Sequence, residues 1–306
     1  MKVLTLNTHA WNEADPKEKF QAVVNLILEE TVDVICLQEV NQFRMGKVGA
    51  DKGTLTDIQA GARAFAEELK HELKSQQSST QQRYRSVQQE ISVADDNYAK
   101  LLVSALADAG QTYYWSWAPA HIGYDCFDEG VAILSRYDFW VKQIILDKAT
   151  WPYADYHRRV AVKASIDVPG IEEKVSVYSS HFSWWEADGS GFQAEWDTLN
   201  RERQRVNGSQ IFCGDFNQIA EQPGAGYDYI KQTAPDLKDS YQVAMQVSGD
   251  ATIPGEIDGW RHESTPKRID YAWVSDALAV TDYQTVFTGK NYPVASDHFG
   301  IMITIQ

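Results

Sequence analysis

Polar residues that can bind a metal ion or move a proton follow several apolar stretches of the sequence. In "IFCGDFN", the apolar run ends at a glycine and is followed by Asp215 and Asn217. Taken alone, this pattern is typical of a turn, because glycine, aspartate and asparagine readily leave a strand. The same kind of residue borders other apolar stretches, at Asn7, Glu39, Glu129, His181, Asp270, Asp297 and His298. The repetition favours one shared site at the edge of a sheet.

These residue types suit metal-assisted hydrolysis of a phosphate ester. A hard cation such as Mg²⁺ prefers carboxylate and amide oxygens and leaves positions open for water and a phosphate oxygen. Glu39 and Asp297 suit that role. The reaction also needs a group that orients or deprotonates water, and donors to the charge that develops on the phosphate oxygens. Histidines held by carboxylates, together with asparagine amides, supply such groups.

Hydrophobic periodicity predicts the elements that must position these residues. Helices are predicted at about 20–30, 58–73, 101–109 and 192–206. Strands are predicted at about 2–7, 32–40, 130–140, 159–168, 174–181, 210–214, 269–274 and 300–305. Because most strands do not alternate with helices, the pattern favours two packed sheets covered by helices over a doubly wound parallel sheet.

The chain is expected to form one domain over residues 1–306, since no Pro- or Gly-rich linker divides it. Residues from about 44 to 97 are interpreted as a variable inserted region. Within it, the glutamines and serines of "KSQQSSTQQRYRSVQQ" indicate a mobile surface segment. We expect no catalytic residue in this region.

Charge and composition limit the possible partners. The formal net charge of −15 repels polyanions unless a local basic groove opposes it, so nucleic acid is an unlikely substrate, whereas a small phosphorylated molecule needs only local cations. The N-terminus lacks the basic and apolar regions of a signal peptide, and no apolar run approaches the length of a membrane span. Three cysteines, two of them in strand patterns, fit a reducing compartment. We therefore expect a cytoplasmic protein without membrane contact.

The order of the motifs resembles the endonuclease/exonuclease/phosphatase superfamily of DNase I-like, metal-dependent phosphoesterases. Seven fragments carry the resemblance: "LTLNTHAW", "DVICLQEV", "DEGVAILSR", "SSHF", "GDFN", "RIDYAWV" and "SDHFGI". Each fragment alone is a weak pattern, but all seven in this order form a specific signal. The resemblance implies a four-layered α/β sandwich, in which two mainly antiparallel sheets pack face to face with helices outside.

The resemblance also implies roles for the residues around the metal. Glu39 would be the principal metal ligand, with Asn7 beside it, and Asp297 would complete or support the metal shell. His298 would be the catalytic histidine that lies against the scissile phosphate. Asp270 would hold the imidazole of His298. The implied ion is Mg²⁺, with Mn²⁺ as a possible substitute.

A second group would act on water and on the phosphate. Asp215 would align or activate the attacking water, and Asn217 would hydrogen-bond a phosphate oxygen. His181 resembles the second histidine of the DNase I-like branch, and Glu129 resembles its carboxylate partner. Which histidine acts as acid and which as base is left open by the sequence. Three other histidines without an evident carboxylate partner are expected to be structural or exposed: His9, His71 and His157.

The flanking loops indicate the kind of ester. "YYWSWAPAHIGYD", "WPYADYH", "HFSWWEADGSGFQAEW" and "GEIDGWRHE" combine aromatic and acidic residues, which suits a sugar. Few cations lie near the motifs, and Arg159 and Arg268 are candidates to clamp a single phosphate. The preferred hypothesis is a phosphomonoesterase for a small metabolite such as a phosphosugar. The sequences of the flanking loops resemble those of the bacterial group that includes maltose 6'-phosphate phosphatase.

Two alternatives are kept. The first is a phosphodiesterase, either a DNase-like endonuclease or a sphingomyelinase-like lipid hydrolase. The second is a regulatory protein that has this fold without turnover. The sequence does not give the oligomeric state.

Overall fold

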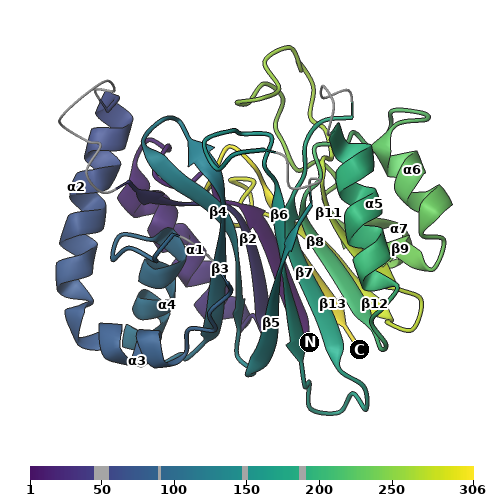
Figure 1. The fold of residues 1–306 in the computed structure, drawn as a ribbon, viewed down its shortest axis with the longest axis horizontal. Helices are drawn as coiled ribbons and strands as arrows, with labels where there is room; N and C mark the ends of the chain where they lie inside the picture. The colour runs from purple at the N-terminus through teal and green to yellow at the C-terminus, as the bar shows by residue number, and fades with distance from the viewer. Residues whose placement is uncertain (45–54, 89–90, 147–150, 186–190) are drawn as a thin grey trace.

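A computed structural model describes residues 1–44, 55–88, 91–146, 151–185 and 191–306. Two β-sheets pack face to face in the middle of the molecule, with one group of helices on each outer face (Figure 1). This arrangement confirms the predicted four-layered α/β sandwich. Most strand pairs are antiparallel, and β1–β2, β7–β8 and β10–β12 are parallel.

The first sheet has seven strands in the order β10-β12-β13-β1-β2-β4-β3. Its strands are β1 (Lys2–Asn7), β2 (Val34–Phe43), β3 (Tyr114–Gly123), β4 (Phe127–Ser135), β10 (Gln246–Ser248), β12 (Val280–Val286) and β13 (Gly300–Ile305). The second sheet has six strands in the order β5-β6-β7-β8-β11-β9. Its strands are β5 (Phe139–Ile145), β6 (Val160–Ile166), β7 (Val175–His181), β8 (Gln210–Asp215), β9 (Leu237–Asp239) and β11 (Asp270–Ser275).

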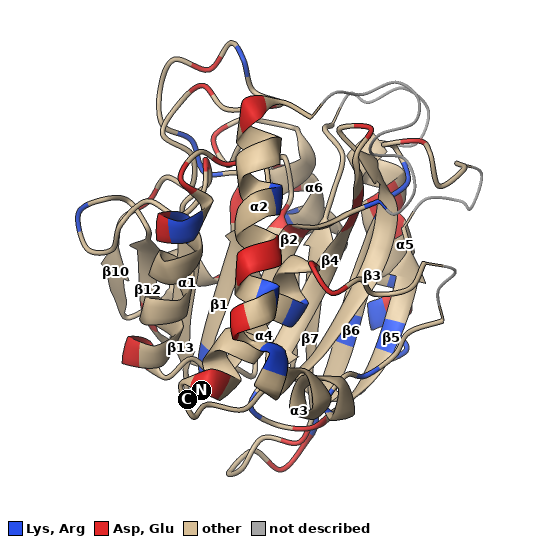
Figure 2. Ribbon diagram, turned by 90° about the vertical axis from the view of Figure 1, so that its left-hand side faces the viewer, with Lys and Arg blue, Asp and Glu red and all other residues tan. Residues whose placement is uncertain are grey.

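Helices cover both sheets. The helices near the first sheet are α1 (Pro16–Glu30), α2 (Asp57–Glu72), the 3₁₀ turn η1 (Lys74–Gln76), α3 (Gln77–Gln82) and α4 (Tyr98–Asp108). Those near the second sheet are α5 (Gly191–Arg203), α6 (Gly226–Thr233) and α7 (Ser240–Val243). Acidic and basic residues are interspersed on the outward helices α1, α2 and α4, whereas the strands behind them are largely uncharged (Figure 2). No helix in the described parts of the chain is long and apolar enough to cross a membrane.

Apolar side chains fill each interface between the layers. Between the sheets, Val34, Ile133, Val177 and Ile211 belong to one buried cluster that extends over both inner faces. Because both faces of the central strands are covered, these strands are apolar along nearly their whole length, which is why they were recognisable in the sequence. The sandwich therefore forms a rigid base for side chains at the strand ends.

The structure corrects two expectations about loops. The stretch expected to be a mobile, Gln-rich surface segment contains η1 and α3, and the side chain of Thr80 on α3 is buried with its hydroxyl bonded to that of Ser104. "YYWSWAPAHIGYD" is mostly strand β3, and Trp115 and Trp117 on it are core residues rather than loop residues. The helix of the inserted region matches α2, while residues 45–54 and 89–90 lie outside the described residues.

Gly214 shows how tightly β7 and β8 approach each other. Its φ of 151° is rarely adopted by other residues, and a Cβ there would collide with the carbonyl oxygen of Ser180. We expect Gly214→Ala to lower the free energy of unfolding by on the order of 3 kcal/mol, because backbone strain and overpacking add. Gly61→Ala on α2 is the control, since no atom lies within 4 Å of the place that a Cβ would occupy and alanine favours helix. Urea denaturation that showed equal stability for both variants would contradict this account.

Candidate active site

The polar strand ends gather at one edge of the sandwich, around a pocket of about 310 Å³. Register explains the gathering in the second sheet, because His181 on β7 and Asp270 on β11 both pair with Asp215, the last residue of β8. In the first sheet Asn7 ends β1, and its partner on β2 is Gln38, next to Glu39. The pocket is lined by His9, Glu39, His121, Ile122, Gly123, Tyr124, Glu129, Tyr156, Arg159, His181, Trp184, Asp215, Asn217, Asp258, Gly259, Asp297 and His298.

A β-bulge turns Glu39 into the pocket. Gln38 and Glu39 of β2 lie opposite a single residue of β4, and Glu39 has a φ of +48°, which is uncommon for a residue with a side chain. One carboxylate oxygen, Oε1, accepts a hydrogen bond of 2.9 Å from Asn7 Nδ2. The other, Oε2, is buried and has no hydrogen-bond partner among the residues that the structure describes. Such backbone strain and an unpartnered oxygen are typical of a functional site.

The pocket fits a hard divalent cation. Desolvation and the nearby charge of Glu129 raise the pKa of Glu39 to about 8, and a bound cation would offset both effects and favour the ionised carboxylate. The ligand atoms of Glu39, His181 and Asp215 lie within 4.8 Å of one another, as do those of His9, Glu13 and Asp297. The carboxylate-rich set and the orphaned Oε2 match the ligand preference of Mg²⁺.

Asn7 and Asp297 occupy different places around Glu39. The Asn7 amide nitrogen donates to Glu39 and, over 3.0 Å, to Asp215, while its oxygen accepts from the backbone N–H of His9. Asn7 thus holds the two carboxylates together, and its role as a metal ligand stays a prediction. Asp297 lines the same pocket as Glu39, with its oxygen 3.6 Å from His9 Nδ1.

His298 lies between two carboxylates. Its Nδ1 donates to Asp270 over 3.0 Å, and its Nε2 lies 3.7 Å from Asp215 Oδ2. Burial disfavours the charged ring, but Asp270 and Asp215 outweigh this effect and raise the pKa of His298 well above its usual value. His298 is therefore held as an imidazolium whose free N–H can donate at the pocket.

His181 has the opposite character. Trp260 Nε1 can only donate, and it donates to Asn217 Oδ1 over 2.8 Å, which turns the Asn217 amide nitrogen toward His181 Nε2 at 3.2 Å. Nε2 must then accept, so the ring is neutral. Burial, reinforced by the positive charge of Arg159, lowers the pKa of His181 well below its usual value. The two histidines are thus held in different protonation states.

Asp215 connects both histidines. Its Oδ2 accepts from Asn7 and lies 3.6 Å from His181 Nε2, and its Oδ1 accepts the backbone N–H of Asn217. Burial and the charge of Asp270 raise the pKa of Asp215 to about 7. A carboxylate with this pKa is suited to accept a proton from water near neutral pH.

Glu129 was expected to be the carboxylate partner of His181, and the structure shows that this expectation is wrong. Glu129 pairs with His121, whose Nε2 lies 3.2 Å from Glu129 Oε1 and whose Nδ1 donates to the carbonyl of Arg158. A bulge in β3 at Ala120 brings His121 opposite Glu129. Burial would raise the pKa of Glu129, but His121 and Arg159 outweigh it and lower that pKa. The sequence reasoning missed His121, and only its place eight residues before Glu129 in a strand pair could have indicated it.

His9 was expected to be structural or exposed, and the structure instead places it on the pocket wall. Its Nδ1 bonds to Glu13 over 2.8 Å and its Nε2 lies 3.1 Å from the hydroxyl of Tyr124. Burial disfavours the charged ring, but Glu13 and Asp297 outweigh it and raise the pKa of His9 to about 9. His157 likewise has a carboxylate partner, Asp155, at 2.7 Å.

The two arginines proposed to clamp phosphate differ in position. Arg159 lines the pocket and is only 4% exposed, and its guanidinium makes neither a hydrogen bond nor an ion pair within the described part of the chain. The expectation that Arg268 contacts phosphate is wrong. It is buried against Asp239 at 2.6 Å and stacks against tyrosines, so it cannot reach a substrate in this pocket.

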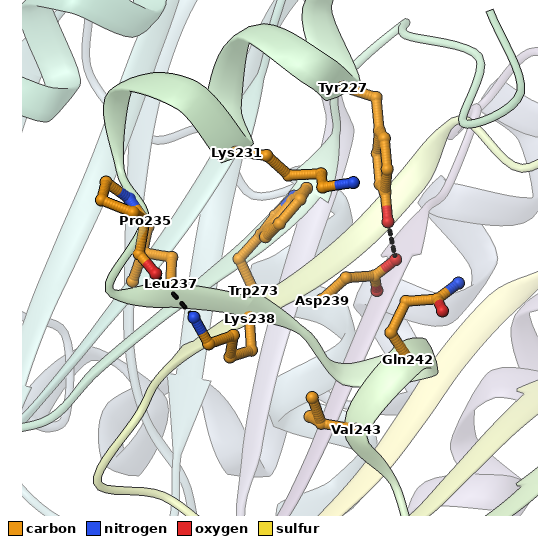
Figure 3. A pocket seen from close by; sticks show the side chains of 9 residues that line it. All are labelled: Tyr227, Lys231, Pro235, Leu237, Lys238, Asp239, Gln242, Val243 and Trp273. Carbon is orange, nitrogen blue, oxygen red and sulfur yellow. Dashed lines mark hydrogen bonds between the residues drawn. The ribbon is translucent and has the colours of Figure 1, made fainter.

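Figure 3 shows Asp239 in a separate hollow of about 520 Å³, beside α6 and β9. Its carboxylate also accepts from the hydroxyl of Tyr227 at 2.8 Å. A third donor to this carboxylate is the backbone N–H of Tyr241, at 3.1 Å, so the partners of Asp239 lie on or next to elements that form or cover the second sheet. This hollow contains none of the predicted site residues.

Comparison with known proteins identifies the family. A sequence model described as "Endonuclease/Exonuclease/phosphatase family" matches residues 10–298. No curated protein sequence matched the chain. A family protein from Leptotrichia buccalis C-1013-b has 27% identity and a TM-score of 0.77, and the match covers 100% of this chain and 99% of the other.

Two more distant structures share the fold. The mannosyl-6-phosphatase of Bacteroides thetaiotaomicron VPI-5482 has 15% identity and a TM-score of 0.61, covering 100% of this chain and 99% of that one. The catalytic domain of human nocturnin, solved with bound sulfate, has 16% identity and a TM-score of 0.59, covering 100% and 94%. Since the family model spans nearly the whole chain and the fold agrees, the chain belongs to the endonuclease/exonuclease/phosphatase family, whose members generally hydrolyse phosphoester bonds.

Proposed function

We propose that this protein is a metal-dependent phosphomonoesterase that acts on a small phosphorylated metabolite, with a phosphosugar as the preferred substrate. The observation that carries the proposal is the guanidinium of Arg159, which has no hydrogen-bond or ion-pair partner among the described residues. A charge this deeply buried is costly without a partner. An incoming phosphate would supply that partner through charge-assisted hydrogen bonds.

The neighbouring residues can divide the work of hydrolysis. The N–H of His298 donates to a phosphate or leaving-group oxygen, and Asp270 holds the ring in place. Asp215, whose Oδ2 lies 3.6 Å from Nε2 of neutral His181, offers an acceptor that orients the attacking water and takes its proton. Asn217 keeps the imidazole of His181 neutral, because the amide nitrogen of Asn217 is fixed toward the ring. One pocket thus contains both hydrogen-bond donors for a phosphate group and an acceptor for the attacking water.

A bound Mg²⁺ would supply charge neutralisation for the phosphate oxygens during this reaction. Glu39 would hold it through the unpartnered Oε2, with Asp297 or Asp215 contributing further oxygens. Mn²⁺ prefers similar ligands and is proposed as a substitute.

The pocket favours a terminal phosphate over a polynucleotide. Among the described residues that line it, Arg159 is the single lysine or arginine, against five carboxylates. Nuclease grooves need cations for phosphates on both sides of the cut. Its volume of about 310 Å³ also lies at the lower end for small-molecule sites. These features support a monoester of a compact molecule, and nucleic acid and membrane lipid are not proposed as partners.

Other observations support the choice of a sugar and of the compartment. A mannosyl-6-phosphatase shares the fold, and Trp184, Tyr124 and Tyr156 supply aromatic faces at the pocket.

The three cysteines are buried and form no disulfide, which supports the proposed cytoplasmic location.

Arg159→Ala tests the proposal directly. We expect kcat/KM for a phosphomonoester to fall by about 100-fold, since a buried charge-assisted contact to the phosphate is lost. Inhibition by inorganic phosphate should weaken in parallel. The matched control is Arg201→Ala, an exposed arginine on α5. The substrates are a monoester and the methyl diester of the same alcohol. Preference for the diester, with no effect of Arg159→Ala on phosphate inhibition, would overturn the proposal in favour of a phosphodiesterase.

A further inference from the structure

A short turn from a distant part of the chain closes one side of the pocket. Trp260 Nε1 donates to Asn217 Oδ1, and the carboxylate of Asp258 accepts from the hydroxyl of Tyr124 over 2.7 Å. Between them, Gly259 has a φ of +80°, and a Cβ there would lie 2.9 Å from the ring of Trp184. Asp258–Trp260, called the 258–260 turn below, is thus fixed at both of its ends.

The hydroxyl of Tyr124 lies in a chain of hydrogen bonds that reaches the 258–260 turn. Tyr124 donates its proton to Asp258, and the tyrosine oxygen lies 3.1 Å from His9 Nε2, which also contacts the amide nitrogen of Asn12 at 2.8 Å. His9 in turn bonds to Glu13 through Nδ1. This chain connects the turn between β3 and β4, which contains Tyr124, to the segment after β1.

Asp258 and Tyr124 differ from the buried catalytic groups in their exposure. The side chain of Asp258 is 41% exposed and Tyr124 is 40% exposed, whereas His298 and Asp215 are almost completely buried. One oxygen of Asp258, Oδ1, accepts from the backbone of Gly259 and lies 3.5 Å from a guanidinium nitrogen of the exposed Arg261. An ionised carboxylate still has room for further donors. The pair therefore offers hydrogen-bond acceptors to a ligand at the pocket mouth.

We propose that Asp258 and Tyr124 form a hydroxyl-binding subsite for the leaving group of the substrate. With the phosphate on Arg159, the remainder of a small substrate would extend toward the mouth, where these acceptors and the ring of Trp184 lie. Vicinal hydroxyls bind to a carboxylate, and the C–H face of a sugar ring packs on an aromatic face. The ligand class is therefore a phosphorylated sugar or polyol. This inference rests on the proposed phosphomonoesterase function.

The test compares a substrate with hydroxyls to one without. For Asp258→Ala and Tyr124→Phe, kcat/KM is measured for mannose 6-phosphate or maltose 6'-phosphate, whichever the wild type hydrolyses faster, and for p-nitrophenyl phosphate. We expect the ratio of the two kcat/KM values to fall by about 10-fold or more in Asp258→Ala, mainly through KM of the sugar phosphate. Tyr124→Phe should lower it less. Glu256→Gln, an exposed carboxylate two residues earlier, should leave it unchanged.

The outcomes separate this inference from the function on which it rests. If the wild type releases phosphate from both substrates and Asp258→Ala leaves the ratio unchanged, the subsite is wrong and the phosphomonoesterase stands. Equal losses on both substrates would show that Asp258 only maintains the pocket, which also overturns the subsite. A wild type that hydrolyses neither monoester overturns both proposals. Thermal unfolding of each variant shows that a changed ratio does not reflect misfolding.

Discussion

His298→Ala is expected to reduce kcat for phosphate release by about 10³-fold, because it removes the N–H that faces the phosphate from the pocket. The structure holds this group firmly, through the bond from Nδ1 to Asp270 and the proximity of Nε2 to Asp215. KM should change much less, since Arg159 and the metal site remain. The measurement is steady-state phosphate release at saturating Mg²⁺.

The matched control is His71→Ala, an exposed histidine on α2. Asp270→Asn should produce a smaller loss than His298→Ala, because the ring remains but its charge is less well supported. Turnover by His298→Ala at the wild-type rate, with the fold intact, would contradict the enzymatic role of this site and favour a non-catalytic protein.

Glu39→Gln is expected to abolish the dependence on metal together with the activity, with kcat/KM falling by about 10³-fold or more. Added Mg²⁺ should raise the melting temperature of the wild type, because a ligand bound only by the folded state stabilises it. It should not raise that of Glu39→Gln. Differential scanning fluorimetry with and without EDTA measures both.

The pH dependence of the metal-free protein provides a second readout for Glu39. The folded pKa of about 8 lies above that of an ordinary glutamate, so the folded state binds more protons than the unfolded state between these values. The metal-free wild type should therefore be most stable on the acidic side of this window and lose stability progressively as the pH rises from 4.5 to about 8. Glu39→Gln removes this loss and should melt at a higher temperature than the wild type at pH 8 in EDTA.

Glu172→Gln, an exposed glutamate, is the control for this pair of measurements. A metal-free Glu39→Gln protein that is less stable than the wild type at pH 8 would contradict the electrostatic account. Equal stabilisation of the wild type and Glu39→Gln by Mg²⁺ would show that the ion binds elsewhere.

The sequence was informative where an apolar strand ends at a polar residue. Asp215, Asp270 and His181 could be predicted to meet, because the strands that bear them are continuous apolar runs and neighbouring strands bring their ends to one edge. The apolar inner faces of the two sheets must likewise be buried against each other, which predicts a sandwich. The two-sheet architecture and the meeting of these strand ends could thus be predicted from local patterns, whereas the roles of the site residues came from the family resemblance.

Bulges and long-range pairings could not be predicted in this way. His121 faces Glu129 only because Ala120 is an extra residue in β3, and strand periodicity contains no signal for such an insertion. His9 meets Tyr124 across more than a hundred residues of chain. Arg268 lies near a motif in sequence, yet its guanidinium points to Asp239 in the second sheet. Tertiary context decides each of these cases.

The most direct test of the proposed function is phosphate release from a panel of substrates, with Mg²⁺ or with EDTA. The panel contains sugar phosphates, nucleotides, a generic phosphodiester and plasmid DNA. We predict selective release from a sugar phosphate that EDTA abolishes. Cleavage of the diester or of DNA, with no release from any monoester, would contradict the account.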